Sequence, residues 1–303
     1  MAFGFRAGEE VSAGVRRVAQ EQIDGARGGL AGESDHGVDK AIHEARKSFK
    51  RLRALMRLVR PSLGKKVYRS ENRTFRDCGR RLAGARDAAV LVDTMDALAP
   101  DLDLSVTAFA RARSALTAEH LSRRDQVVER ARAQLHVAAT LELAAARVPG
   151  WPLDGLEARD LAPGLQRVAR TGRQAMAIAR DDPSPELLHE WRKRVKYHWH
   201  HVELFEAVDP AELVPRAEDV HRLADLLGDD HDLHVLSATL LADPAIFGPT
   251  EDLEGLVRLV ARRRSSLQHD AFALGRELYG DHARDLVVHL TDGLGRLAGT
   301  PTR

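Results

Sequence analysis

The same pattern of residues occurs twice in this chain, and this repeat constrains the fold more than any other feature. The pattern His-x-x-Arg-Lys-x-x-Lys at His43–Lys50 returns at His189–Lys196, 146 residues later. Two further matches keep the same order, at offsets of 150 and 145 residues: Arg17-Val18-Ala19 with Arg167-Val168-Ala169, and Leu82, Arg86-Asp87 and Val90 with Leu227, His231-Asp232 and Val235. A period this long is not that of a solenoid. We therefore expect two related halves packed about a pseudo-twofold axis, residues 5–148 and 153–298.

The spacing of apolar residues predicts that both halves are helical. Apolar positions recur three and four residues apart over long stretches, and no segment has the alternation typical of a strand. Prolines fall mostly between these stretches, and Ser184-Pro185-Glu186 is typical of a helix start. We expect an all-α protein with helices over 8–31, 38–60, 65–98, 103–122, 124–147, 156–181, 186–208, 213–242, 251–279 and 281–298.

Cysteine content and hydropathy indicate the compartment. Cys78 is the only cysteine, so no disulfide within the chain is possible and no oxidising environment is needed. The first ten residues lack the apolar core of a signal peptide, and no run of about 18 apolar residues occurs. We expect a cytoplasmic protein.

The net charge of +1 conceals a strongly basic segment. Between Lys40 and Arg86 there are 16 Lys and Arg residues against 3 Asp and Glu residues. Such a block indicates an acidic partner, although an arginine-rich surface in contact with water would have the same composition. The arrangement of the charges is therefore more informative than their number.

In the segment 42–60, helical geometry separates apolar from basic residues. One face is apolar, with Ile42, Ala45, Phe49, Leu52, Met56 and Val59. The other is basic, with His43, Arg46, Lys47, Lys50 and Arg57, and Arg53 lies at its border. Like charges three and four residues apart on a helix repel each other. Such an arrangement of like charges is expected where another molecule supplies the negative charge that offsets their repulsion.

The second copy repeats this separation. Basic and histidine residues share one face, His189, Arg192, Lys193, Lys196 and His200, opposite Leu188, Trp191, Val195, Val202 and Phe205. In the first half the next helix adds four arginines, Arg69, Arg73, Arg76 and Arg80. Its counterpart has Glu218 and Asp225 in place of Arg73 and Arg80, so we expect the first half to carry more of the positive charge.

These residue types suit a linear polyanion. An arginine fork binds two phosphate oxygens, a lysine supplies a mobile point charge, and a histidine donates a hydrogen bond. The alternative for the basic faces is contact with water or salt bridges between helices. For His43 and His189 we expect ligand contact rather than a bond between helices. His198 falls on the apolar face and is expected in the core.

Signals of catalysis are missing from the sequence. There is no glycine-rich phosphate loop, nucleophile elbow or HExxH motif. The pairs His200-His201 and His231 with His234 have loose spacing and cationic neighbours, so we expect no metal site and no cofactor. Aromatic residues make up 5% of the chain and do not alternate with the basic ones, unlike a groove for single-stranded nucleic acid.

At these motifs the sequence resembles the conserved histidine α-helical domain (CHAD) family. The resemblance rests on the two His-x-x-Arg-Lys-x-x-Lys patterns and on Leu82–Val90 and Leu227–Val235, and it covers residues 5–298. It implies two four-helix bundles related by a pseudo-twofold axis. It also implies a non-catalytic protein that binds inorganic polyphosphate in a central cleft and associates with polyphosphate granules. The predicted binding residues are His43, Arg46, Lys47, Lys50, Arg53, Arg57, Arg73, Arg76, Arg80, Arg17, His189, Arg192, Lys193 and Lys196.

Two alternative functions use the same residues. The basic faces would also suit nucleic acid or an acidic protein, and the histidines would suit a metal-dependent phosphohydrolase. The chain departs from the family pattern at Ala83, where glycine is usual, and along the acidic segment 216–226. These departures predict weaker binding by the second half.

Overall fold

The computed structural model describes residues 3–32, 37–82, 87–98, 106–122, 127–242, 244, 250–280 and 283–299. Within these ranges the regular elements are helices and no strand occurs, which confirms the expected all-α fold. No helix in this part of the chain is long and apolar enough to cross a membrane.

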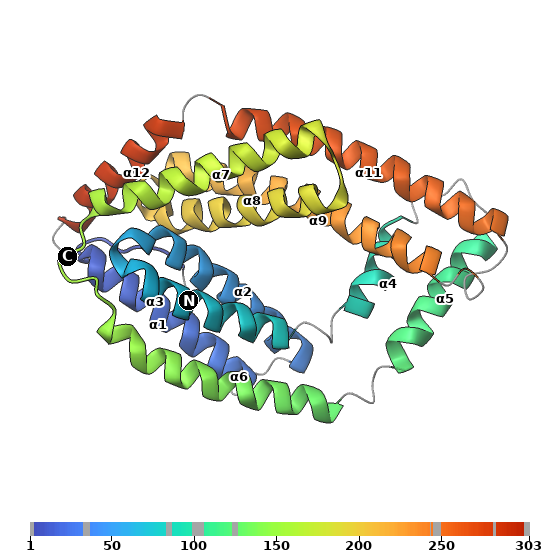
Figure 1. Ribbon diagram of the computed structural model, residues 1–303, viewed down its shortest axis with the longest axis horizontal. Coiled ribbons are helices and arrows are strands. Elements are labelled where there is room, and N and C mark those ends of the chain that lie inside the picture. The colour runs from blue at the N-terminus through green and yellow to red at the C-terminus, as the bar shows by residue number, and fades with distance from the viewer. Residues whose placement is uncertain are drawn as a thin grey trace.

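The helices follow the order of the sequence (Figure 1). The first half contains α1 (Val11–Leu30), α2 (Val38–Leu58), α3 (Arg60–Arg81), α4 (Asp87–Ala97), α5 (Val106–Ser122) and α6 (Val127–Arg147). One 3₁₀ turn, Val148–Gly150, lies at the expected junction of the two halves, and a second, Ala158–Leu161, occupies the start of the helix predicted over 156–181. The second half contains α7 (Ala162–Asp181), α8 (Pro185–Phe205), α9 (Pro210–Ala242), α11 (Thr250–Leu278) and α12 (Ala283–Ala298).

The predicted boundaries of two helices can be compared directly with the structure. The single helix expected over 65–98 is divided into α3 and α4, with Leu82 at the C-terminal cap of α3. Gly64 has a φ of 72°, a conformation that glycine adopts without strain, so a kink marks the predicted start at residue 65. Pro185 begins α8 as expected, but the Ser184 side chain makes no capping hydrogen bond.

The largest hydrophobic core is centred on the first half and extends into the second, and another core lies within the second half. In the first half, Phe49 of α2 and Phe75 of α3 are buried together with residues of α1 and α6. In the second half, Trp191 of α8 and Leu223 of α9 are buried together with residues of α7 and α11. Burial of such large apolar side chains supplies most of the stabilisation of each set of helices.

A third core joins the two halves. Met95 of α4 and Leu116 of α5 pack with Leu236 of α9 and Leu256 of α11. Figure 1 shows α4, α5 and the parts of α9 and α11 that pack with them at one end of the molecule, away from α1 and α12. The expected halves 5–148 and 153–298 therefore exchange packing contacts, because α4 and α5 lie against helices of the other half.

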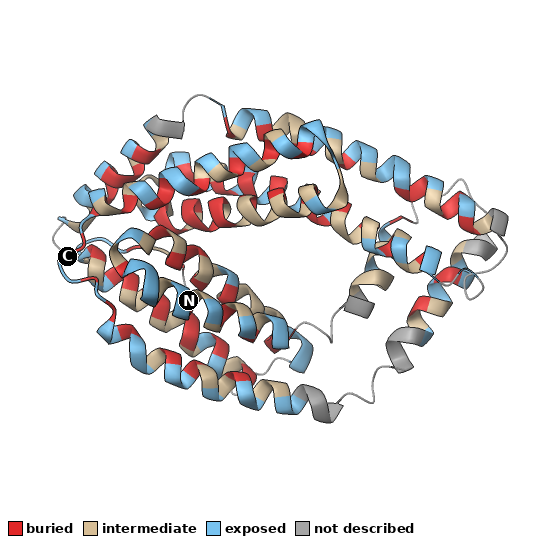
Figure 2. Ribbon diagram, in the orientation of Figure 1, coloured by how far each residue is buried: buried red, intermediate tan, exposed pale blue. Residues whose placement is uncertain are grey.

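The helices that carry the repeated basic pattern, α2 and α8, pack against each other. Figure 2 shows α8 buried along much of its length, and its buried residues include Trp191, Val195 and Phe205. At Gly164 of α7 the chain passes very close to α2, because an added Cβ would lie 2.0 Å from the carbonyl oxygen of Leu58. Glycine thus permits the close approach of α7 to the pair α2 and α8.

Candidate functional site

The basic residues of α2 lie at the surface of the first half. The side chains of His43, Arg46 and Lys47 are half-buried, and Lys50 is exposed. Arg46 donates a hydrogen bond of 3.2 Å to the carbonyl oxygen of Leu82, the residue that caps α3. Arg46 therefore has a structural contact at the end of α3 in addition to its place on the basic face.

On α8, the equivalent basic residues face α9. The Arg192 guanidinium lies near three carboxylates of α9, Asp225, Asp229 and Asp232. Burial lowers the pKa of Arg192, and these carboxylates act in the opposite direction. Lys193 pairs with Glu190 one turn away on the same helix. The acidic character predicted for the second half is thus present beside the site.

His189 packs against a second histidine. Its ring centre lies 4.5 Å from that of His231 on α9. Burial, the charge of His231 and the charge of Lys193 lower the pKa of His189 to about 4. The His189 ring therefore stays neutral in the free protein until the pH falls far below the usual histidine pKa of about 6.5, so protonation of this ring near pH 6.5 does not add to anion binding.

The basic faces of α2 and α8 meet. Lys196 is half-buried, and its pKa is lowered to about 7 by burial and by the charges of Arg192 and Lys50. Lys50 belongs to α2 of the first half, and it also lowers the pKa of His200 on α8. Equivalent cations from the two repeats thus lie close together.

Two arginines further along α2 point toward both α3 and α8. Arg57 donates hydrogen bonds to Asn72 of α3, at 3.0 Å, and to the carbonyl oxygen of Arg53, at 2.7 Å. Its guanidinium also lies 3.7 Å from the centre of the Tyr197 ring on α8, a distance typical of a cation–π contact. Arg53 makes a longer contact of this kind with Tyr197, at 5.9 Å.

The remaining predicted residues lie elsewhere. On α3, Arg73 and Arg80 are exposed, and Arg76 pairs at 2.8 Å with Asp77, its neighbour in the chain. Arg17 on α1 is largely occupied within its own half. It contacts Glu9 at 2.6 Å and Glu21 at 3.1 Å, and it donates to the carbonyl oxygen of Gly4.

The histidines of α8 outside the motif are buried. His198 is 6% exposed with its ring 5.2 Å from that of Tyr279, which confirms its expected place in the core. His200 was placed on the basic face, but it is fully buried and contacts Glu203 at 3.0 Å. His201 bonds with the carbonyl oxygen of Ala54 across the α2–α8 interface. These contacts give both histidines structural partners.

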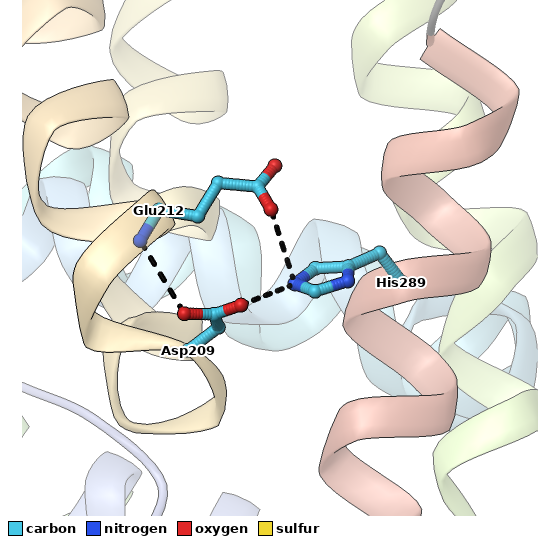
Figure 3. Close-up of side chains that lie close together, drawn as sticks. All are labelled: Asp209, Glu212 and His289. Carbon is cyan, nitrogen blue, oxygen red and sulfur yellow. Dashed lines mark hydrogen bonds and ion pairs between the residues drawn. The ribbon is translucent and has the colours of Figure 1, made fainter.

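Sequence reasoning missed a cluster at the start of α9, shown in Figure 3. Nε2 of His289 on α12 lies 3.4 Å from a carboxylate oxygen of Asp209 and 3.7 Å from one of Glu212. Within the described part of the chain, these side chains are the one group of three placed closely enough to share a metal ion. Glu212 also donates its backbone amide to Asp209, so the carboxylates belong to the start of α9. We interpret the cluster as a polar contact that docks α12 on α9.

Two buried carboxylates also escaped the sequence analysis. Glu71 of α3 is 3% exposed and receives two hydrogen bonds from Arg147 of α6, at 2.7 and 2.9 Å. Asp230 of α9 is 2% exposed and accepts bonds from Arg264 and Gln268 of α11. Asp230 lies inside the segment Leu227–Val235 that carries the family resemblance, so this part of the segment holds helices together. Ala83 and Arg86 lie outside the described residues, as does the side chain of Asp87.

Fold and site together define a helical protein in which two repeated halves bring equivalent cationic residues to one place. Residues 17–241 match the CHAD domain family, which is most of the chain, so this chain belongs to that family. The crystal structure of the CHAD domain from the plant Ricinus communis has the same fold, with a TM-score of 0.61 and 18% sequence identity. That similarity covers 92% of this chain and 94% of the plant chain. No curated protein matches.

Proposed function

We propose that the basic faces of α2 and α8 bind inorganic polyphosphate without catalysing a reaction. The observation that carries the proposal is the meeting of like charges from the two halves. Lys50 and Lys196 interact unfavourably, and the pKa of Lys196 is lowered to about 7. A polyanion would relieve this repulsion and favour the charged form of Lys196.

The residues around this meeting point suit a linear chain of phosphates. Lys47 and Lys50 extend the cationic surface along α2, and Arg73 and Arg80 are exposed on α3, which packs against α2. Each additional phosphate would meet another cation along this surface. A compact phosphate ester would use only part of it.

Titration with polyphosphates of several lengths at two salt concentrations tests the proposal. Neutralising six to eight charges predicts a logarithmic salt slope of about −4 to −6, using the value of about −0.7 per charge known for single-stranded nucleic acid. Affinity should rise with chain length until the site is filled. A flat salt response, or equal affinity for triphosphate and long chains, would contradict the proposal.

Two controls separate this function from the alternatives. Competition with DNA or RNA of equal total charge measures whether the surface prefers polyphosphate to another polyanion. Release of orthophosphate from polyphosphate, measured with and without a chelator, tests for metal-dependent hydrolysis.

We also propose association with polyphosphate granules, and a fluorescent fusion that does not colocalise with stained granules would contradict it.

A further inference from the structure

A cavity of about 460 Å³ lies between α2, α3, α7 and α8, and its charge is unbalanced. Four arginines line it, Arg57, Arg60, Arg167 and Arg194, and among the described residues that line it Glu190 is the only carboxylate. Glu190 is already engaged, because it lies 3.5 Å from Arg194 and pairs with Lys193. The cavity therefore presents a large excess of positive charge.

The repeat relates the cavity to an equivalent place in the structure, where the charge of the arginine is balanced by a carboxylate. Shifting Arg51 and Arg57 by the offset of 146 residues gives Tyr197 and Glu203. Arg51 and Glu203 form an ion pair between α2 and α8, whereas Tyr197 and Arg57 form a cation–π contact at the equivalent position. At one of the two equivalent places an arginine of α2 thus meets a carboxylate of α8, and at the other an arginine of α2 meets an aromatic ring of α8.

A second pair of equivalent positions differs in the same way, with a carboxylate in the second half and an arginine in the first. Glu206 stands one helical turn after Glu203, and Arg60 is its equivalent by the same offset. Two carboxylates near the end of α8 thus correspond to two arginines near the end of α2. Arg60 lies 4.8 Å from the centre of the Tyr68 ring, which again is not an acidic partner.

The two equivalent places also differ in whether another segment of the chain covers them. Beside the Arg51–Glu203 pair, the N-terminal segment packs onto the protein, with Arg51 lying 4.9 Å from the centre of the Phe3 ring. Arg17 donates to the carbonyl oxygen of Gly4 in this segment. The equivalent of Arg17 is Arg167, which instead is exposed and lines the cavity. A segment of the chain covers one place, and open space lies at the other.

The cavity also has an apolar wall. Val168 and Ile178 of α7 and Leu187 of α8 line it, together with the rings of Tyr68 and Tyr197. Contact with this apolar surface would not stabilise a bound inorganic anion. A ligand with an organic part would bury apolar area against it. The volume falls within the range of about 300–1,000 Å³ that is typical of sites for small molecules.

We propose that this cavity binds an organic phosphate of about nucleotide size. The arginines hold the phosphate groups through their forked N–H donors, and the apolar wall holds the organic part. Around α8, Tyr197 lies about 80–100° and Arg194 about 140–160° from His189 and Lys196, since each residue turns a helix by about 100°. On α8 the site is therefore separate from the polyphosphate face, whereas on α2 it shares Arg57 with the predicted polyphosphate-binding residues. The inference does not depend on polyphosphate binding.

Calorimetric titration with ATP and AMP, with inorganic triphosphate for comparison, tests the proposal. ATP has the triphosphate charge together with an organic part, so it should bind at least tenfold more tightly than triphosphate. Arg167→Glu combined with Arg194→Gln should weaken ATP binding at least tenfold and leave affinity for long polyphosphate within about twofold. Arg173→Glu is the matched control, because Arg173 is an exposed arginine of α7 that does not line the cavity. It should leave ATP binding unchanged.

Three results would overturn the inference. The first is the absence of measurable binding of both ATP and AMP to the wild-type protein. The second is equal affinity for ATP and triphosphate, which would define an inorganic anion site. The third is loss of ATP binding in Lys47→Glu with Lys50→Glu but not in the cavity variant, which would place ATP on the polyphosphate face. Circular dichroism on each variant verifies that it is folded.

Discussion

Lys50 of α2 and Lys196 of α8 occupy equivalent positions in the two repeated patterns, and their ammonium groups lie close enough to interact electrostatically. Burial is the largest cause of the lowered pKa of Lys196, followed by the charges of Arg192 and Lys50. Asp225 and Asp232 of α9 act in the opposite direction. The pseudo-symmetry of the chain thus brings two equivalent lysines together at the place where its halves meet.

This relationship predicts that polyphosphate binding takes up protons. Since the pKa of Lys196 is about 7 in the free protein, the side chain is largely neutral at about pH 8. A bound anion raises that pKa and returns the proton, so uptake approaches about one proton per protein. Titration calorimetry in buffers of different ionisation enthalpy measures the number. Lys196→Met should remove most of the uptake, and equal uptake by both proteins would exclude Lys196 as its source.

Neighbouring residues of the α2 pattern should separate binding from stability. Lys47→Ala should weaken polyphosphate binding and leave the free energy of unfolding within about 0.5 kcal/mol of wild type, because its charge lies one helical turn from the like charge of Lys50. Arg46→Ala should weaken binding too, but it also removes the hydrogen bond to Leu82 and costs about 1 kcal/mol. Urea unfolding and polyphosphate titration on both variants test this. Equal loss of stability in the two variants would show that Lys47 has a structural role.

The buried histidines of α8 predict instability in acid. Burial lowers the pKa of His198 to about 3 and those of His200 and His201 to about 4, below the unfolded value of about 6.5. Between these limits the unfolded chain binds more protons than the folded one. The stability that they contribute is therefore complete above about pH 6.5 and is lost as the pH falls toward 4.

His198→Phe tests this linkage. One fewer histidine should reduce the dependence of the unfolding free energy on pH by up to about 1.4 kcal/mol per pH unit between about pH 6.5 and 4. The matched control is His136→Phe, at an exposed position of α6. Urea unfolding at several pH values provides the measurement, and an unchanged slope in the His198 variant would disprove the linkage.

The ion pair between α3 and α6 should contribute strongly to stability. Arg147→Met leaves the Glu71 carboxylate buried without its partner, which typically costs about 3–5 kcal/mol. Arg147 is itself partly exposed, so the lower end of that range is expected. Adding Glu71→Gln should recover part of the loss, because no charge then remains buried. If the double variant is as unstable as the sum of the two single variants, the two residues do not interact energetically.

The helical repeat was readable from the sequence because it depends on local periodicity. Apolar residues three and four apart predicted α2 and α8 within a few residues, and the offset of 146 residues related them. The burial of His198 followed from its position on the apolar face. The division of 65–98 into two helices was missed, since no proline or strong change of periodicity marks residues 82–87.

The candidate site shows the same contrast between features that local periodicity predicts and features that depend on contacts between helices. The sequence placed His43, Lys50, His189 and Lys196 on basic helix faces, a property of single helices. It did not show that Arg17 pairs with Glu9 and Glu21, that His200 is buried, or that the pKa of His189 falls to about 4. Each of these depends on residues contributed by other turns or helices.

The sequence by itself determined the helical class, the duplicated organisation and the residues that carry positive charge. Only the tertiary structure decided which charges meet and which are neutralised. The reason is physical: periodicity is set by the geometry of one helix, whereas burial and electrostatic interaction depend on distances between helices. Lys50 and Lys196, 146 residues apart in the chain, interact because α2 packs on α8.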